Sequence, residues 1–66
     1  MSVIKVIEVL SESQVSWVDA ARQALDKVSK TIRNVKSVRI KDHSVNVVHG
    51  EIKSYRINAK VSFLLD

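Results

Sequence analysis

The sequence contains no cysteine, which excludes a disulfide as a source of stability. Its only two histidines, His43 and His49, follow no recognisable metal-ligand spacing, and we predict no metal site from them. A chain of 66 residues is short enough that folding buries only about 60% of the surface that the unfolded chain exposes. Because neither disulfides nor metals are expected, oligomerisation remains as the means of burying more surface.

Proline is absent, Gly50 is the single glycine, and no tract has low complexity, so no part of the chain reads as a flexible linker. We therefore expect one ordered domain over residues 1–66. No apolar run approaches the ~20 residues of a membrane span, and Lys5 and Glu8 interrupt the opening segment, which is unlike a signal peptide. Together with the absence of cysteine, these features predict a soluble cytoplasmic protein without a membrane partner.

Positive charge is concentrated in the middle of the chain. The net charge is +4, and residues 22–41 contain seven lysines and arginines. Within residues 31–42, TIRNVKSVRIKD, four of these cations are interspersed with apolar residues: Arg33, Lys36, Arg39 and Lys41. Such a segment could face nucleic acid, a small anion or water. Nucleic acid is not expected as a partner, because the three aromatic residues lie elsewhere, at Trp17, Tyr55 and Phe63.

The first third of the chain predicts a strand followed by a helix. Residues 3–10 are β-branched and apolar on both faces, apart from two charges, which predicts a strand that needs cover on both sides. Residues 11–15 are polar except for Val15 and predict a turn. Ser16 has the features of an N-cap, because its hydroxyl can accept a hydrogen bond from the backbone N–H of Asp19. We therefore expect the helix to begin at Trp17.

The predicted helix has one apolar stripe, whose members recur at steps of three and four: Trp17, Ala21, Leu25 or Ala24, Val28, Ile32 and Val35. Asn34 tolerates the left-handed conformation that ends many helices. The expected helix is therefore about seventeen residues long, which corresponds to ~25 Å.

Two strands are predicted in the second half of the chain. The first alternates apolar and basic side chains over residues 38–41 and continues with alternation over residues 45–47, with an irregularity expected near residues 42–44. Residues 49–51 predict a tight reversal, and residues 55–65 alternate strictly with apolar side chains at the odd positions. The predicted fold class is α+β, with a three-stranded antiparallel sheet wrapped on one helix in the order β-α-β-β. Since the last strand would reach ~44 Å, one helix cannot cover the sheet, and a closed oligomer is expected.

Four segments resemble the dodecin family in order and spacing: KVIEV at residues 5–9, SWVDAA at 16–21, TIRNVKS at 31–37 and YRINAKVSF at 55–63. The resemblance runs nearly from end to end. It implies a β-α-β-β fold, assembly into a hollow spherical homododecamer, and binding and storage of a small molecule such as flavin.

The resemblance also implies positions for a flavin site. Flavin-binding dodecins carry a tryptophan that stacks on the isoalloxazine ring and a glutamine that hydrogen-bonds to it, and these positions fall here on Ser37 and Arg56. Asp42 matches an acidic residue near the flavin in some members. Aromatic stacking is worth about 0.5 to 1.5 kcal/mol per pair beyond burial, and Ser37 cannot supply it. We therefore expect an altered pocket in which flavin (FMN, FAD or riboflavin) binds weakly or not at all. Trp17, at the helix start, is expected to be a packing anchor rather than a substitute.

An anionic small molecule is the other ligand that the sequence suggests. Arg39 and Arg56 lie on the polar faces of predicted neighbouring strands, and a guanidinium suits phosphate or carboxylate. The candidate ligand-binding residues are therefore Ser37, Arg39, Asp42 and Arg56. No thiol and no cluster of Ser, His and carboxylate is suggested, so we expect no enzymatic activity. The alternative to ligand binding is a structural shell with no specific small ligand.

Overall fold

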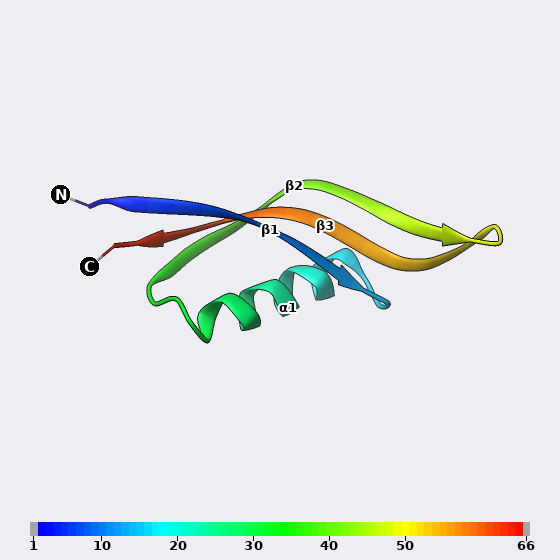
Figure 1. Ribbon diagram of the computed structural model, residues 1–66, viewed down its shortest axis with the longest axis horizontal. Coiled ribbons are helices and arrows are strands. Elements are labelled where there is room, and N and C mark those ends of the chain that lie inside the picture. Colours follow the sequence, from blue (N-terminus) through cyan, green and yellow to red (C-terminus); the bar gives the residue numbers. More distant parts are fainter. Residues whose placement is uncertain (1, 66) are drawn as a thin grey trace.

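The computed structural model describes residues 2–65 and shows one helix and three strands in the order β-α-β-β. The elements are β1 (Ile4–Ser13), α1 (Trp17–Ser29), β2 (Val35–Val48) and β3 (Glu51–Leu64). The strands form one antiparallel sheet in the order β1-β3-β2, and α1 lies along one face of it (Figure 1). The predicted fold class is confirmed.

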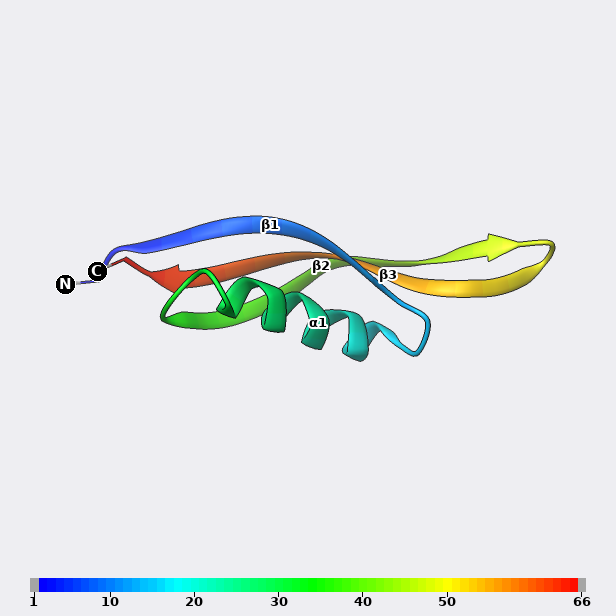
Figure 2. The same cartoon turned by 60° about the horizontal axis from the view of Figure 1, so that its bottom comes forward.

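β2 and β3 form a long hairpin that extends beyond the helix (Figures 1 and 2). Its turn lies at the predicted reversal, where His49 and Gly50 have φ of 52° and 77°. Two consecutive residues at positive φ are typical of the two-residue turns whose twist matches that of the flanking strands. The chain is elongated, with extents of 51 × 20 × 13 Å.

β1 is longer than the sequence predicts, because it continues through the polar residues that were expected to form a turn. The Ser11 hydroxyl donates to the carbonyl oxygen of Ala20 at 2.8 Å. The hydroxyl of Ser13, which is buried, donates to Asp19 Oδ2 at 2.6 Å and accepts from the backbone N–H of Val15. Each serine thus finds its partner in the beginning of the helix or the connecting loop, and β1 remains in the sheet up to Ser13.

The helix begins as predicted and ends earlier. The Ser16 hydroxyl accepts from the backbone N–H of Asp19 at 2.9 Å, and α1 starts at Trp17. It has 13 residues instead of about seventeen, because the β-branched residues after Ser29 have a lower helix propensity. Asn34 has a φ of 61°, as expected of a residue that ends a helix, but it lies beyond the helix, directly before β2. Among residues 2–65, no helix is long and apolar enough to cross a membrane.

The core lies between α1 and the middle of β3. Ala20, Ile57 and Ala59 form its centre, and all three are at most 2% exposed. The alanine on each side lets the helix approach the sheet closely. The buried residues of the helix are Ala20, Ala24 and Val28, so Ala24 and not Leu25 belongs to the apolar stripe. Ile32 and Val35 lie outside the helix, which corrects the predicted stripe at its C-terminal end.

Candidate functional site

Within residues 2–65, no helix or strand covers the face of the sheet opposite α1, and we call it the open face. Along β3 the odd positions 57, 59, 61 and 63 are buried against the helix, and the even positions Arg56, Asn58, Lys60 and Ser62 point the other way. Apolar side chains of the edge strand β1 also lie there, and Leu10 is 81% exposed. The open face therefore combines polar groups with apolar surface that this chain alone leaves in contact with water.

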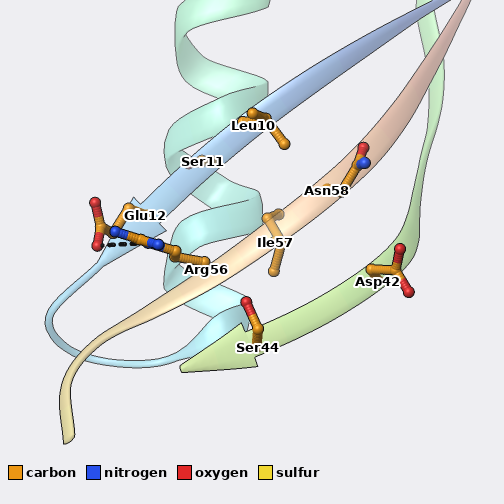
Figure 3. Close-up of a pocket in the computed structure, with 8 residues that line it drawn as sticks. All are labelled: Leu10, Ser11, Glu12, Asp42, Ser44, Arg56, Ile57 and Asn58. Atoms are coloured by element: carbon orange, nitrogen blue, oxygen red, sulfur yellow. Dashed lines mark hydrogen bonds and ion pairs between the residues drawn. The ribbon is translucent and has the colours of Figure 1, made fainter. Parts of the chain in front are cut away.

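A pocket with a volume of about 460 Å³ lies on this face, and we call it the larger pocket. All three strands contribute to its lining (Figure 3), which consists of Leu10, Ser11, Glu12, Asp42, Ser44, Arg56, Ile57 and Asn58. Asp42 and Ser44 reach the pocket because β2 contains an irregularity at Lys41, between the pairs Ile40 with Ala59 and Asp42 with Asn58. Because of this extra residue, Ile40 faces the helix before it and His43 faces the helix after it, so Asp42 and Ser44 lie on the open face.

An ion pair joins the adjacent strands β1 and β3 at the pocket. Arg56 Nε donates to Glu12 Oε1 at 3.1 Å, as Figure 3 shows. The Ser54 hydroxyl donates to the same carboxylate oxygen. The hydrogen bond from Ser54, and after it the bond from Arg56, lowers the pKa of Glu12 below its ordinary value. The pair occupies only one of the five N–H groups of the guanidinium, so Arg56 can also donate to a ligand.

Asn58 brings a buried hydrogen-bond acceptor without a partner to the pocket. Its Oδ1 is buried and accepts no hydrogen bond from residues 2–65. Unpaired buried polar atoms are uncommon, because each one loses its hydrogen bonds to water. A ligand N–H or a bound cation would satisfy this oxygen. The pocket therefore offers an acceptor in Asn58, donors in Arg56 and an apolar surface in Leu10.

A second, smaller hollow of about 200 Å³ lies further along the open face. It is lined by Val6, Ser37, Arg39, Lys60 and Ser62, and the hydroxyls of Ser37 and Ser62 are hydrogen-bonded to each other. Its charged groups are both cations, whereas the larger pocket contains two carboxylates and one guanidinium.

The comparisons with known proteins identify the family. The Dodecin family model matches residues 3–66. The chain belongs to the dodecin family. It is 32% identical over 63 residues to the calcium dodecin of Mycobacterium tuberculosis, covering 96% of this chain and 89% of that protein. Membership of this family supports a small-molecule-binding protein.

Solved dodecin structures have the same fold. The crystal structure of the Mycobacterium tuberculosis calcium dodecin, described as a calcium-chelating antigen, gives a TM-score of 0.85 at 32% identity and covers 98% of this chain and 93% of that one. The tt0972 protein of Thermus thermophilus gives 0.93 at 24% identity, with 100% and 97% covered. The dodecin of Streptomyces coelicolor gives 0.93 at 22% identity, with 98% and 93% covered.

The four residues that the dodecin resemblance and the charge pattern suggested do not form one cluster within a chain. Asp42 and Arg56 line the larger pocket, whereas Ser37 and Arg39 line the smaller hollow. Arg39 lies opposite Lys60, and Arg56 lies opposite Ser44 on one side and Glu12 on the other. The two arginines are therefore separated along the sheet instead of being direct neighbours.

Sequence reasoning missed several residues of these two sites. Glu12 was placed in a turn, although its alternation with Leu10 and Glu8 would have assigned it to the same strand face. Lys60 and Asn58 were recognised as polar-face residues but were not related to a pocket. Their importance depends on the register between strands, which a single sequence does not show.

Trp17 has the packing role that the sequence predicted. Its Nε1 donates to the carbonyl oxygen of Ser44 at 2.9 Å, and its ring meets His43 and Tyr55 edge to face, at centroid distances of 4.9 and 5.2 Å. The indole thus attaches the first turn of the helix to β2 and β3 on the face opposite the pocket. No group of three His, Cys, Asp or Glu residues that could hold a metal is found among residues 2–65.

Proposed function

We propose that this chain is a homo-oligomeric, non-enzymatic dodecin that binds and stores a small molecule in the larger pocket of the open face. The observation that supports this most directly is the unpaired, buried Oδ1 of Asn58, which lines a pocket that also contains exposed apolar surface. A cysteine-free composition suits the cytoplasm, which we propose as its location.

The pocket suits a planar heterocycle better than a strongly charged anion. Two carboxylates, Glu12 and Asp42, stand against the single guanidinium of Arg56, which already pairs with Glu12. A negative ligand would therefore meet repulsion as well as attraction. A heterocycle can donate an N–H to Asn58, accept from Arg56 and cover Leu10 with its apolar part. Flavin has these features, and it is the ligand that we propose to test first.

Flavin affinity is expected to be weaker than in dodecins that carry the stacking tryptophan. At the stacking position that the resemblance implies, Ser37 has no aromatic ring to offer a flavin. Its hydroxyl, in the smaller hollow, is hydrogen-bonded to that of Ser62. Fluorescence titration with riboflavin, which lacks a phosphate, measures this affinity. Ser37→Trp supplies the ring that the family resemblance places on the flavin across a two-fold axis between copies, and it should increase the affinity. Lys53→Gln, which changes an exposed charge outside both sites, should leave it unchanged.

Tight and strongly quenching binding of riboflavin by the unmodified protein would contradict the proposed weakening. Failure of Ser37→Trp to increase the affinity would contradict the placement of the stacking position. If mass spectrometry finds no small molecule released from the denatured native protein, and no flavin binds, the structural shell is the better account.

Calcium is a second candidate, because the larger pocket is rich in oxygen and a relative is a calcium dodecin. Asp42 and Asn58 lie directly opposite each other on β2 and β3, and carboxylate and amide oxygens suit calcium. Calcium usually takes six to eight oxygen ligands, so these residues of one chain would need completion by water or a second copy. Calorimetry with calcium on chelator-treated protein tests this, and Asp42→Asn should lower the affinity at least about tenfold. Absence of saturable heat from the unmodified protein would remove this candidate.

The proposed assembly is a homododecamer, since the open face leaves apolar side chains of β1 uncovered and the family resemblance suggests twelve copies. Native mass spectrometry at micromolar concentration gives the copy number. A folded monomer would contradict the assembly argument, and another closed number would contradict only the number twelve.

A further inference from the structure

The smaller hollow places two cations side by side without a recorded acidic partner for either. Arg39 on β2 and Lys60 on β3 are direct cross-strand partners on the open face. Like charges directly opposite each other destabilise a sheet. Within residues 2–65, neither side chain takes part in an ion pair.

The carboxylate that lies opposite Lys60 in the strand register is already paired with another cation. Glu8 on β1 lies opposite Lys60, but its carboxylate forms an ion pair with Lys41 Nζ at 3.8 Å. The row of Glu8, Lys60 and Arg39 therefore has one carboxylate for two cations, and that carboxylate is paired with Lys41, which lies outside the row. The surplus of positive charge is located at the hollow, where Lys60 is half-buried and Arg39 is exposed.

Hydroxyl donors complete the hollow. Ser37 and Ser62 are cross-strand partners whose hydroxyls share one hydrogen bond. Two hydroxyls carry two hydrogens, so this bond leaves one O–H able to donate to a ligand. A guanidinium, an ammonium and a hydroxyl around a hollow of about 200 Å³ are the donors that a tetrahedral oxyanion uses.

We infer that the smaller hollow is an anion subsite that binds a phosphate group through Arg39, Lys60 and the Ser37–Ser62 hydroxyl pair. It is separate from the larger pocket, and its test needs no flavin, so the two proposals can fail independently. The phosphate group can belong to free phosphate or to an organic phosphomonoester. In both cases the anion would neutralise the repulsion between the two cations.

The test uses the assembled full-length protein and inorganic phosphate as the probe, with chloride adjusted to hold ionic strength constant. Calorimetry should show saturable binding. Arg39→Gln and Lys60→Gln should each weaken it at least about tenfold, the loss expected for a charge-assisted hydrogen bond. Lys53→Gln removes the same charge from an exposed position of β3 outside the hollow and should change the affinity less than about twofold.

Two further variants distinguish a built site from a basic surface. Lys60→Arg should keep phosphate binding, which also controls for misfolding of Lys60→Gln. Glu8→Gln removes the nearest negative charge and should tighten binding. A parallel titration with phenyl phosphate identifies the source, since tighter binding than inorganic phosphate indicates a phosphomonoester and weaker binding indicates the free ion.

Two results would overturn the inference. Equal losses in Arg39→Gln, Lys60→Gln and Lys53→Gln would mean that phosphate responds only to general positive charge. No saturable phosphate binding by the unmodified assembly would mean that Arg39 and Lys60 are neutralised in another way, such as by a carboxylate from a second copy.

Discussion

On the helix-covered face of the sheet, Ile57, Ala59 and Val61 are at most 2% exposed, whereas on the open face Leu10 is 81% exposed. The same three strands build both faces. The covered face is buried within one chain, because alanines of α1 pack against it. The open face carries the larger pocket and the smaller hollow, and no element of the described residues covers its apolar side chains. This difference places the folding core on one face and supports the proposal that assembly and binding use the other.

The lengths of the elements explain why only one part of the sheet is covered. The 13 residues of α1 span ~20 Å, whereas the 14 residues of β3 span ~48 Å. The end of the β2–β3 hairpin therefore has no helix beneath it (Figures 1 and 2). A small chain with so much uncovered sheet gains stability by burying it between copies.

The largest effect is expected from a charge placed on the apolar part of the open face. Leu10→Asp should dissociate the assembly, because a carboxylate buried between copies without a partner costs several kcal/mol. Native mass spectrometry and size-exclusion chromatography would report smaller species. The matched control is Val18→Asp on α1, where the side chain is 67% exposed on the helix. If Val18→Asp dissociates the protein and Leu10→Asp does not, assembly uses the helix side and the comparison of the faces is wrong.

A second prediction compares two residues of β3 that lie on opposite faces of the sheet. Val61 is fully buried, and Val61→Ala should lower the free energy of unfolding by about 2 kcal/mol through lost burial and a cavity. Asn58→Ala on the open face should change it by less than about 1 kcal/mol, because the Oδ1 that it removes has no hydrogen bond to lose. Chemical denaturation at one fixed protein concentration measures both. A larger loss for Asn58→Ala than for Val61→Ala would show that the open face, not the covered face, holds the folding core.

Local sequence signals predicted the features that depend on a few neighbouring residues. Ser16 caps the helix, Asn34 adopts the left-handed conformation, the chain reverses at His49 and Gly50, and β3 alternates as expected. Each of these follows from side-chain chemistry or from a short period. The end of β1 was not predictable in this way, because Ser11 and Ser13 are satisfied by the helix start and its loop, which tertiary structure brings close.

The candidate site could be predicted only in part, because it depends on strand register. Strand alternation alone would place Asp42 on the same face as Ile40, against the helix. The irregularity at Lys41 transfers Asp42 to the open face and into the larger pocket. Another irregularity lies at Lys36. Val35 pairs with Phe63 on the helix side of the sheet, and Ser37 pairs with Ser62 in the smaller hollow on the open face. A sequence can suggest that a strand is irregular. If the position of the irregularity is wrong by one residue, however, side chains are assigned to the wrong face of the sheet.

The smallest predicted effect concerns the acid stability of the open face. Hydrogen bonds from Ser54 and Arg56 lower the pKa of Glu12 from its ordinary value of 4.5, so the folded protein binds this proton less readily than the unfolded chain. The stabilisation is present above pH 4.5 and is lost as the pH falls through the lower folded pKa. Glu12→Gln should therefore reduce the dependence of unfolding free energy on pH in this acid range.

Two other carboxylates serve as references for the pH dependence measured in Glu12→Gln. Asp19, on the covered side, also has a lowered pKa because it accepts hydrogen bonds from Ser13 and Gln23, so part of the acid dependence should remain in Glu12→Gln. Glu51→Gln, at the exposed start of β3, removes the same formal charge without touching Arg56. Denaturation measured from pH 3 to pH 7 should thus give a flatter profile for Glu12→Gln than for Glu51→Gln. Identical profiles would mean that the pair of Glu12 and Arg56 does not survive in the assembled protein, where a ligand or a second copy has displaced it.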